Sequence, residues 1–388
     1  MAPRGGASVT AQTATAAGSP YIGITRHVAD DLVRDGADGL ILEAAGRTRL
    51  LRLASVTRLR QRLVSTNAGE RPCWYAIVES PVVETDQAFD SAIASWNALT
   101  PPGTWLQVDV RARLGDGRWT RYYAMAVWAS GLETISRHSV GGQDDDDAHI
   151  ATDTLQLRTA TGRAFQYRLT LFAADARSSP SVQSVSVVTS DSRHEPPGQA
   201  LASDGHVWGT ELSVPGRSQR VEGSTAAGWC SPTATAMVLA YWGHDVAVPE
   251  AAAATYDYVY EGTGNWAFNT AWAATYGLEA FVARLASLVQ VEMWIRAGAP
   301  VIISLAFGQG ELPGAPIASS DGHLIVVRGF DPAGDVIVND PAGRADGDVR
   351  RVYARDTLEA LWLRSSGGTA YLIHPPGLDV PVGSSGNH

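Results

Sequence analysis

One stretch organises the rest of the chain: residues 228–243, which read GWCSPTATAMVLAYWG. Pro232 suits a first helical turn, Ser231 or Thr233 could cap it, and a glycine ends the stretch. The residues between are apolar on almost every side, which predicts a buried helix. Cys230 then lies at or just before the positive end of the helix dipole, where a thiolate is favoured. This predicts a nucleophilic cysteine, although a free cysteine that simply packs in the core is the other interpretation.

The length and composition indicate a protein of two ordered domains. The chain has 388 residues, which is long for a single core. Its 45% hydrophobic and 18% charged residues are ordinary for globular domains. The net charge of -10 argues against nucleic acid or an anionic membrane surface as the main partner. No apolar run approaches the roughly 20 residues of a membrane-spanning helix, so we expect no membrane span.

The two cysteines, Cys73 and Cys230, are too few for a disulfide framework, and their spacing does not suit zinc. We expect them to lie in different domains; a bridge between them is the lesser alternative, since it would consume the thiol at the helix start. Residues 1–20 lack the apolar core of a signal peptide and predict a disordered tail. Residues 377–388 predict a second, flexible tail.

Residues 21–190 predict an all-β sandwich, jelly-roll-like domain. Several segments alternate or run apolar over strand-like lengths and are separated by glycine and proline turns: 74–78, 105–113, 122–128, 155–157, 165–172 and 182–188. Regularly spaced strands without helices between them are typical of this architecture.

Two features of this domain allow a binding role as well as a structural one. Its tryptophans, Trp96, Trp105, Trp119 and Trp128, could form a sugar-binding platform, but an aromatic core is the interpretation we favour. The acidic run 144–147 could bind calcium, although such a run is more often a solvated loop.

The polar segment 191–204 predicts a linker, and residues 205–376 predict a second domain. Helices are expected at 230–242, 249–260, 269–276, 288–297 and 355–363, and strands at 301–307, 323–330, 336–340 and 370–373. Helices that come first and strands that follow indicate an α+β fold.

A β-hairpin in this domain carries the next candidate groups. Two apolar segments flank the turn at 331–335 and should pair antiparallel. If Phe330 pairs with Asp335, then Ile325 lies opposite Asp340. His323 shares the face of Ile325 and becomes the diagonal neighbour of Asp340.

His323 and Asp340 could therefore act as the base that a thiolate needs and as the group that orients this base. Asn339 would point the other way, but a slip of one residue would exchange the two, so Asn339 is the alternative orienting residue. Alone, His323 could be a packed core histidine, and Asp340 could end a strand at a turn.

Three segments together resemble a known family: GWCSPT at 228–233, DGHLIVV at 321–327 and NDP at 339–341. They are similar to the peptidase-domain relatives of the bacteriocin-processing, double-glycine leader peptidases, which are papain-like cysteine peptidases. The resemblance covers roughly the second half of the chain. It implies that Cys230 is the nucleophile, His323 the general base and Asp340 the orienting carboxylate.

The resemblance also implies an oxyanion hole and cleft walls. A glutamine upstream of the cysteine supplies the oxyanion hole in this family, and Gln219 fits that place, although its gap to Cys230 is longer here. A surface glutamine is the other interpretation. Trp229, Asn265 and Trp266 look like cleft walls by resemblance, and as sequence features alone they could equally belong to the core.

The sequence thus predicts a thiol hydrolase of peptide or amide bonds, with an N-terminal β-sandwich before a papain-like α+β domain. We expect no metal or organic cofactor, a peptide or protein substrate, and no nucleic acid; the sandwich could contact glycan or cell wall. The Gly/Pro-rich segment 308–322 predicts a mobile rim loop over the cleft. The alternative function is a non-catalytic binding protein on a degenerate papain-like scaffold. Relatives of this architecture look secreted or wall-associated, and a cytoplasmic location stays open because no signal peptide is visible.

Overall fold

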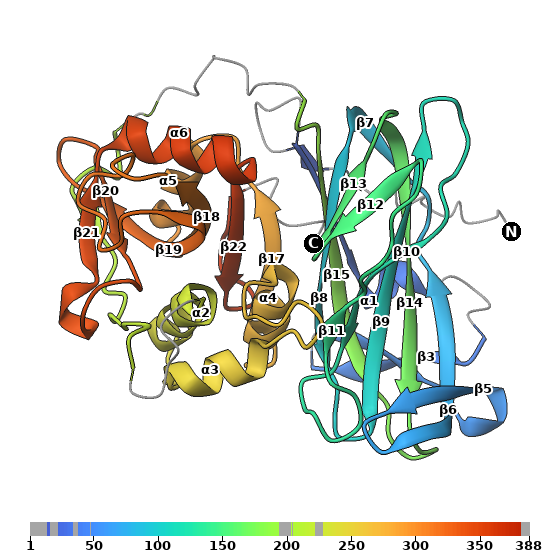
Figure 1. Cartoon of the computed structure of the whole chain (residues 1–388). Helices are drawn as coiled ribbons and strands as arrows, with labels where there is room; N and C mark the ends of the chain where they lie inside the picture. The colour runs from blue at the N-terminus through green and yellow to red at the C-terminus, as the bar shows by residue number, and fades with distance from the viewer. Residues whose placement is uncertain are drawn as a thin grey trace, which may run out of the picture.

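The computed structural model describes residues 14–15, 22–33, 38–46, 48–193, 203, 205–221 and 228–381. They form two bodies that lie side by side, one built of strands and one of helices around a sheet (Figure 1). The predicted tail 1–20, apart from 14–15, lies outside the described residues, as does most of the predicted linker 191–204. Residues 382–388 of the predicted C-terminal tail lie outside them as well.

The described residues up to 193 form two antiparallel sheets. The first has eight strands, ordered β1-β2-β15-β8-β13-β12, and β4 also pairs with β15 and carries β3 on its other side: β1 (Ala14–Thr15), β2 (Ile22–Val28), β3 (Leu40–Ala45), β4 (Thr48–Leu53), β8 (Ser91–Leu99), β12 (Ala148–Ala151), β13 (Thr154–Leu157) and β15 (Ser181–Ser190). The second has seven: β5 (Arg60–Thr66), β6 (Gly69–Glu79), β7 (Val83–Phe89), β9 (Thr104–Leu114), β10 (Tyr123–Trp128), β11 (His138–Ser139) and β14 (Gly162–Ala173). Two short helical segments, α1 (Ala29–Leu32) and η1 (Val56–Arg58), complete this half.

The core of the N-terminal half contains inward-facing side chains of both sheets. Trp96 of β8 and Trp128 of β10 come from different sheets, and their ring centroids are 6.3 Å apart. Trp105 is buried in a smaller cluster, and Trp119 is half-buried. Three of the four tryptophans are therefore core residues rather than a sugar-binding platform.

The acidic run 144–147 is tied to arginines. Three of its carboxylates form ion pairs, namely Asp144 with Arg158, Asp145 with Arg121 and Asp147 with Arg118. In the part of the chain that the structure describes, no three acidic, histidine or cysteine side chains are grouped as a metal site would need. The negative charges of Asp144, Asp145 and Asp147 are therefore balanced by arginines.

The C-terminal half is a seven-stranded antiparallel sheet with helices on both faces. Its helices are α2 (Cys230–Tyr241), α3 (Val248–Thr255), α4 (Trp266–Ala274), α5 (Leu288–Arg296), η2 (Asp346–Asp348) and α6 (Arg355–Ser366). Its strands run in the order β17-β22-β18-β19-β20-β21, with β16 beside β19: β16 (Thr210–Glu211), β17 (Glu279–Arg284), β18 (Val301–Phe307), β19 (Ser320–Phe330), β20 (Val336–Asn339), β21 (Arg350–Tyr353) and β22 (Thr369–His374).

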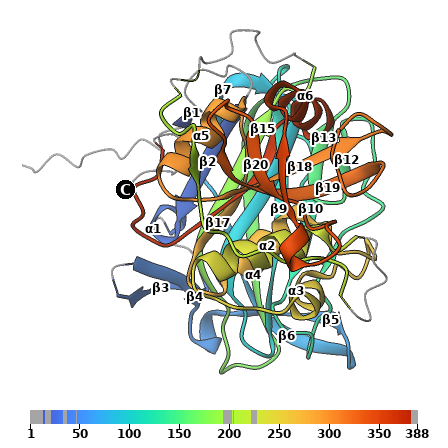
Figure 2. The same cartoon turned by 90° about the vertical axis from the view of Figure 1, so that its left-hand side faces the viewer.

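The two faces of this sheet follow the alternation of side chains along each strand. Val326 of β19 packs into the core that contains α2 and α4, and its neighbour Val327 packs into the core that contains α5 and α6. Figure 2 shows this half in front of the N-terminal sheets. Among the described helices, none has the length and apolar character needed to cross a membrane.

Local hydrogen bonds explain where two helices depart from the prediction. The helix expected at 249–260 ends at Thr255, because the Asp257 carboxylate accepts the N–H groups of Val259 and Tyr260 and so favours a turn. The helix expected from 269 begins earlier, at 266, because the Asn265 side chain caps it.

The hairpin of β19 and β20 contains a bulge that the prediction lacked. Phe330 pairs with Val336 and not with Asp335, so the predicted pairing at the turn is wrong by one residue. The register shifts between Val327 and Gly329, and beyond this point Val326 pairs with Asn339, as the predicted register requires. The bulge therefore restores the predicted alignment at the end of the hairpin nearest His323.

The N-terminal half covers the outer edge of the C-terminal sheet. β17 is the last strand on that side and pairs only with β22 in the described chain. The Asn97 side chain of β8 donates to the Ala280 carbonyl at 2.5 Å and accepts the Ala280 N–H at 3.2 Å. Ser95 accepts the Val282 N–H at 3.1 Å. Side chains of one half thus satisfy backbone groups at the sheet edge of the other half.

Candidate active site

Cys230 is the first residue of α2 and is 7% exposed. No side chain caps this helix, because the predicted cap Ser231 instead shares a 2.8 Å hydrogen bond with the hydroxyl of Tyr371. Burial raises the pKa of the Cys230 thiol. His323 lowers this pKa through its hydrogen bond and its charge, and the N–H groups of Leu324 and Ser231 lower it as well. Together these effects exceed that of burial, so the net pKa of the thiol is lowered. The site therefore favours a thiolate.

His323 lies in β19 and is 2% exposed. Its Nε2 atom is 2.7 Å from Oδ1 of Asp340, which leaves Nδ1 for the interaction with Cys230. Burial lowers the pKa of His323, but the hydrogen bonds and charges of Asp340 and Cys230 together raise it more, so that its net pKa lies above the usual value. The imidazolium and the thiolate favour each other at this site.

Asp340 is completely buried, directly after β20. Besides His323, it accepts the hydroxyl of Tyr353 at 2.7 Å and the N–H of Ala342 at 2.9 Å. Burial raises the pKa of Asp340, but His323, Tyr353 and the N–H of Ala342 together lower it more. The carboxylate therefore stays ionised and is held by several donors. Sequence reasoning missed Tyr353, because β21 is a four-residue strand that begins with two arginines and has little apolar pattern.

Asn339 faces away from His323. Its Oδ1 accepts Nη1 of Arg328 at 2.9 Å, and its Nδ2 donates to the carbonyl of Val214 at 3.1 Å. The structure therefore places Asp340, and not the alternative Asn339, beside the imidazole.

Gln219 lies next to the loop that follows Asp340. Its backbone N–H donates to the Pro341 carbonyl at 2.9 Å, and the neighbouring Ser218 hydroxyl donates to the Gly343 carbonyl at 2.6 Å. Gln219 is 7% exposed, so the surface interpretation is wrong. Residues 222–227, between Gln219 and Cys230, lie outside the described chain.

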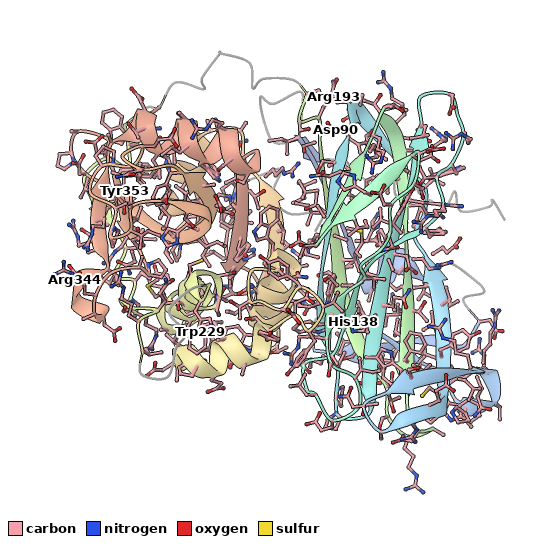
Figure 3. All side chains as sticks on the ribbon, in the orientation of Figure 1. Asp90, His138, Arg193, Trp229, Arg344 and Tyr353 are labelled. Carbon is pink, nitrogen blue, oxygen red and sulfur yellow. The ribbon has the colours of Figure 1, made fainter. Side chains whose placement is uncertain are left out.

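A cleft of about 780 Å³ opens beside Cys230. Two of the three predicted wall residues line it, Trp229 just before α2 (Figure 3) and Trp266 at the start of α4. Asn265 does not: its side chain is fully buried, caps α4 and donates to Asp257 at 2.9 Å. We therefore remove Asn265 from the residues expected to touch a substrate.

Much of the cleft wall comes from residues that sequence reasoning did not indicate. The N-terminal half contributes Ala151, Thr152, Asp153, Thr154 and Gln156, and the loop after α3 contributes Tyr256, Tyr260, Glu261, Gly262, Thr263 and Gly264. Of the predicted rim loop 308–322, Asp321 and Gly322 line the cleft. No signal in the sequence pairs the N-terminal residues with α4, because the two segments are more than a hundred residues apart.

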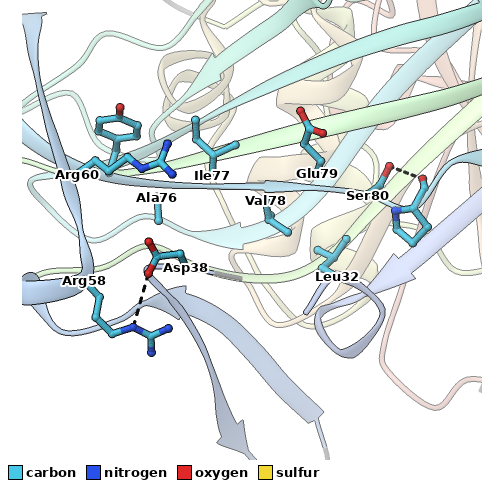
Figure 4. A pocket seen from close by; sticks show the side chains of 11 residues that line it. Leu32, Asp38, Arg58, Arg60, Ala76, Ile77, Val78, Glu79 and Ser80 are labelled. Atoms are coloured by element: carbon cyan, nitrogen blue, oxygen red, sulfur yellow. Dashed lines mark hydrogen bonds and ion pairs between the residues drawn. The ribbon is translucent and has the colours of Figure 1, made fainter. Parts of the chain in front are cut away.

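Cys73 and a hollow in the N-terminal half offer no comparable chemistry. Cys73 of β6 is fully buried, and burial raises the pKa of its thiol more than Arg71 and Arg62 lower it. A hollow of about 480 Å³ lies beside β6 (Figure 4). Arg58 and Asp38 form a 3.8 Å ion pair at its rim, and its described lining has neither cysteine nor histidine.

Tyr353→Phe is expected to lower kcat about tenfold, because the Asp340 carboxylate loses one of the donors that fix its orientation toward His323. The loss of a hydrogen bond to a buried charge should also reduce the free energy of unfolding by about 1–3 kcal/mol. Steady-state kinetics and thermal unfolding of the same variant measure both effects. A lower melting temperature with unchanged kcat would show that Tyr353 only supports the fold.

Two family models match this chain. One family model, described as the peptidase C39 N-terminal domain, matches residues 25–190, and a second, described as the peptidase C39-like family, matches residues 211–370. No curated protein matches the chain.

Two solved structures also align with this chain. A double-glycine motif protease from an AMS/PCAT transporter, in complex with the leader peptide, is 19% identical, covers 42% of this chain and 97% of its own, and has a TM-score of 0.28. A C39-like peptidase from Bacillus anthracis is 15% identical, covers 44% of this chain and 96% of its own, and has a TM-score of 0.29. On the two family matches, which together span most of its length, the chain belongs to the peptidase C39 family of bacteriocin-processing-type cysteine peptidases.

Proposed function

We propose that this protein is a cysteine peptidase that hydrolyses peptide or amide bonds with Cys230 as nucleophile, His323 as general base and acid, and Asp340 as the orienting carboxylate. One observation carries the proposal: a buried chain of interactions runs from Asp340 through His323 to a cysteine at a helix start, beside an open cleft. A thiol, a base and an orienting group in this order are what nucleophilic acyl transfer needs.

The reaction has two halves. The Cys230 thiolate attacks the carbonyl carbon of the scissile bond, and a tetrahedral intermediate with a negative oxygen forms. The His323 imidazolium gives its proton to the leaving amine as the C–N bond breaks, which leaves a thioester. Water then attacks the thioester while His323 takes its proton, and the C–S bond breaks to release the acid and restore the thiolate–imidazolium pair.

The negative oxygen needs donors that are already in position. We propose that the side-chain amide of Gln219 and the backbone N–H of Cys230 supply them. The anchoring of Gln219 beside Pro341 supports this role, because it ties the glutamine to the loop that also positions Asp340.

We further propose a papain-like fold for the C-terminal domain, residues 205–376, and a jelly-roll-like β-sandwich for residues 21–190. A buried helix that begins with the cysteine and packs on an antiparallel sheet supports the first. Two facing antiparallel sheets support the second.

Alkylation at low pH tests the proposed function. After a brief pulse of substoichiometric iodoacetamide at pH 6, we expect label on Cys230 about a hundredfold above Cys73, since the lowered pKa keeps Cys230 partly ionised where an ordinary thiol is almost wholly protonated. Peptide mapping by mass spectrometry locates the label. As the pH falls through the lowered thiol pKa, both labelling and turnover should decline together.

The same experiment separates a peptidase from a non-catalytic scaffold. A degenerate scaffold predicts a Cys230 that alkylates no faster at pH 6 than a free model thiol. Label on Cys73 with none on Cys230 would remove Cys230 as the nucleophile.

A further inference from the structure

The N-terminal half forms part of the catalytic cleft. The turn between β12 and β13, residues 151–154, lines the same cleft as Cys230. At its tip the Asp153 carboxylate accepts the backbone N–H of Trp266 at 2.6 Å. Trp266 begins α4 and lines the cleft itself. One hydrogen bond thus fixes the turn of one half against the substrate-facing wall of the other.

The N-terminal half also holds the second wall, which is the loop 256–264. Asp257, at the base of this loop, accepts the N–H of Ser139 at 3.0 Å. The Tyr258 N–H donates to the Arg137 carbonyl at 3.1 Å, and the buried Arg137 guanidinium donates to the Ala253 carbonyl at 2.9 Å. Both walls of the cleft therefore take their position from residues of the N-terminal half.

Backbone strain coincides with these walls. Among the described non-glycine residues, Thr152 and Glu261 are the two with positive φ, each at 56°, and both line the cleft. A left-handed backbone at a β-branched threonine or a glutamate is unfavourable and persists where the surroundings impose it. Because both strained residues line one cleft, we infer that the surrounding structure holds the side chains of Thr152 and Glu261 in defined positions there.

Apart from the proposed base His323 beside Cys230, the charged side chains among the described lining residues of the cleft are carboxylates. These are Asp153, Glu261 and Asp321, and no arginine is among the described lining residues. Glu261 and Asp321 are exposed and have no ion pair within the described chain, in contrast to the arginine-paired acidic run 144–147. Burial raises the pKa of Asp153 to about 6, so this carboxylate is largely ionised at pH 7.5.

We propose that the turn 151–154 of the N-terminal domain is a substrate-specificity element of the catalytic cleft, and that with Glu261 and Asp321 it selects a positively charged side chain next to the scissile bond. The proposal rests on the proposed peptidase function and names its substrate class, a basic peptide segment. The N-terminal domain then acts as a structural part of the cleft and not as an independent binding module.

Charged affinity reagents test the proposal without a known substrate. The probes are the iodoacetyl derivatives of lysine amide, norleucine amide and glutamate amide, which deliver a cation, a neutral chain and an anion to Cys230 at pH 7.5. We expect the lysine reagent to react about tenfold faster than the norleucine reagent, and the glutamate reagent to react more slowly. Glu261→Gln and Asp321→Asn should each lower the lysine-to-norleucine ratio about threefold, and Asp86→Asn, an exposed carboxylate outside the cleft, should not change it.

A matched pair of substitutions tests the role of the turn. Ala151 and Ala68 are both exposed alanines of the N-terminal half, but Ala151 lines the cleft and Ala68 lies in the turn between β5 and β6. Ala151→Arg should lower the lysine-to-norleucine ratio at least threefold, while Ala68→Arg should leave it unchanged. Iodoacetamide, the small neutral reagent, should label Cys230 equally in both, which checks that the thiol remains intact.

Each outcome decides one question. The inferred charge selection is overturned if the lysine-to-norleucine ratio is near one in the unsubstituted protein. It is also overturned if Glu261→Gln and Asp321→Asn leave this ratio unchanged. In both cases the peptidase proposal stands. Equal ratios in Ala151→Arg and Ala68→Arg overturn the role of the turn. If no reagent, iodoacetamide included, labels Cys230, the peptidase function itself fails and the inference fails with it.

Discussion

Asp340→Asn is expected to lower kcat by about a hundredfold to ten-thousandfold. The buried carboxylate accepts Nε2 of His323 at 2.7 Å and holds the pKa of the imidazole above its usual value. An amide has a similar shape but no charge, so it no longer stabilises the imidazolium that accompanies the thiolate. The pKa of His323 should therefore fall, and the alkaline limb of the activity profile should move to lower pH. Turnover measured across pH would show both changes.

Asn339→Ala is the matched control, because it alters the adjacent residue on the opposite face of the strand. It removes hydrogen bonds to Arg328 and Val214 and leaves buried groups unpaired, so the free energy of unfolding should fall by about 1–3 kcal/mol. The kcat of each folded molecule should change little. The reverse pattern, with stability lost in Asp340→Asn and kcat lost in Asn339→Ala, would assign the orienting role to Asn339.

Gln219→Ala should reduce kcat by about a hundredfold to a thousandfold while Cys230 alkylates at nearly the unsubstituted rate. The glutamine amide is proposed to stabilise the oxyanion of the tetrahedral intermediate, which does not form during alkylation, so the two measurements should separate. Kinetics with a cleavable peptide and pulse labelling with iodoacetamide test this on one preparation.

Ser218→Ala serves as the comparison for Gln219→Ala. The Ser218 hydroxyl anchors the same segment to the Gly343 carbonyl but offers no donor to a substrate. Its loss should lower the melting temperature and reduce kcat far less than Gln219→Ala. If both substitutions lower kcat equally, the segment acts only by supporting the loop after Asp340. If turnover of Gln219→Ala is unchanged, Gln219 does not belong to the oxyanion hole.

Local sequence signals predicted the elements that depend on local physics. The apolar run with its proline and glycine predicted α2 to within one residue of its end, and the β-branched run 301–307 predicted β18 at both ends. Elements missed in the C-terminal sheet include β17, whose residues run Glu-Ala-Phe-Val-Ala-Arg after a glycine turn, and β21, which is short and polar. β17 is stabilised by β22, a partner distant in the chain, and β21 by the preceding strand β20, rather than by patterns of their own.

The placement of His323 beside Asp340 was predictable because two adjoining strands and a short turn restrict the register. The predicted pairing failed at the turn, where a bulge adds a residue, and held near the site. Tyr353 could not be inferred, since it reaches Asp340 from a strand with no clear pattern. The hydrogen bond between Asp153 and Trp266 joins segments 113 residues apart, and such contacts depend on how two domains dock, which a single sequence does not reveal.

Asn97 and Ser95 form hydrogen bonds with the backbone of β17, and the C-terminal domain on its own would lack these bonds. An uncovered strand at the edge of a sheet presents free N–H and C=O groups that can pair with another copy of the same strand. Here the polar side chains of β8 form hydrogen bonds with those groups at Ala280 and Val282. A truncated chain that begins after the linker would expose this apolar edge, Phe281 included, and is expected to self-associate through strand-to-strand pairing. We therefore expect the N-terminal domain to protect its neighbour against this self-association.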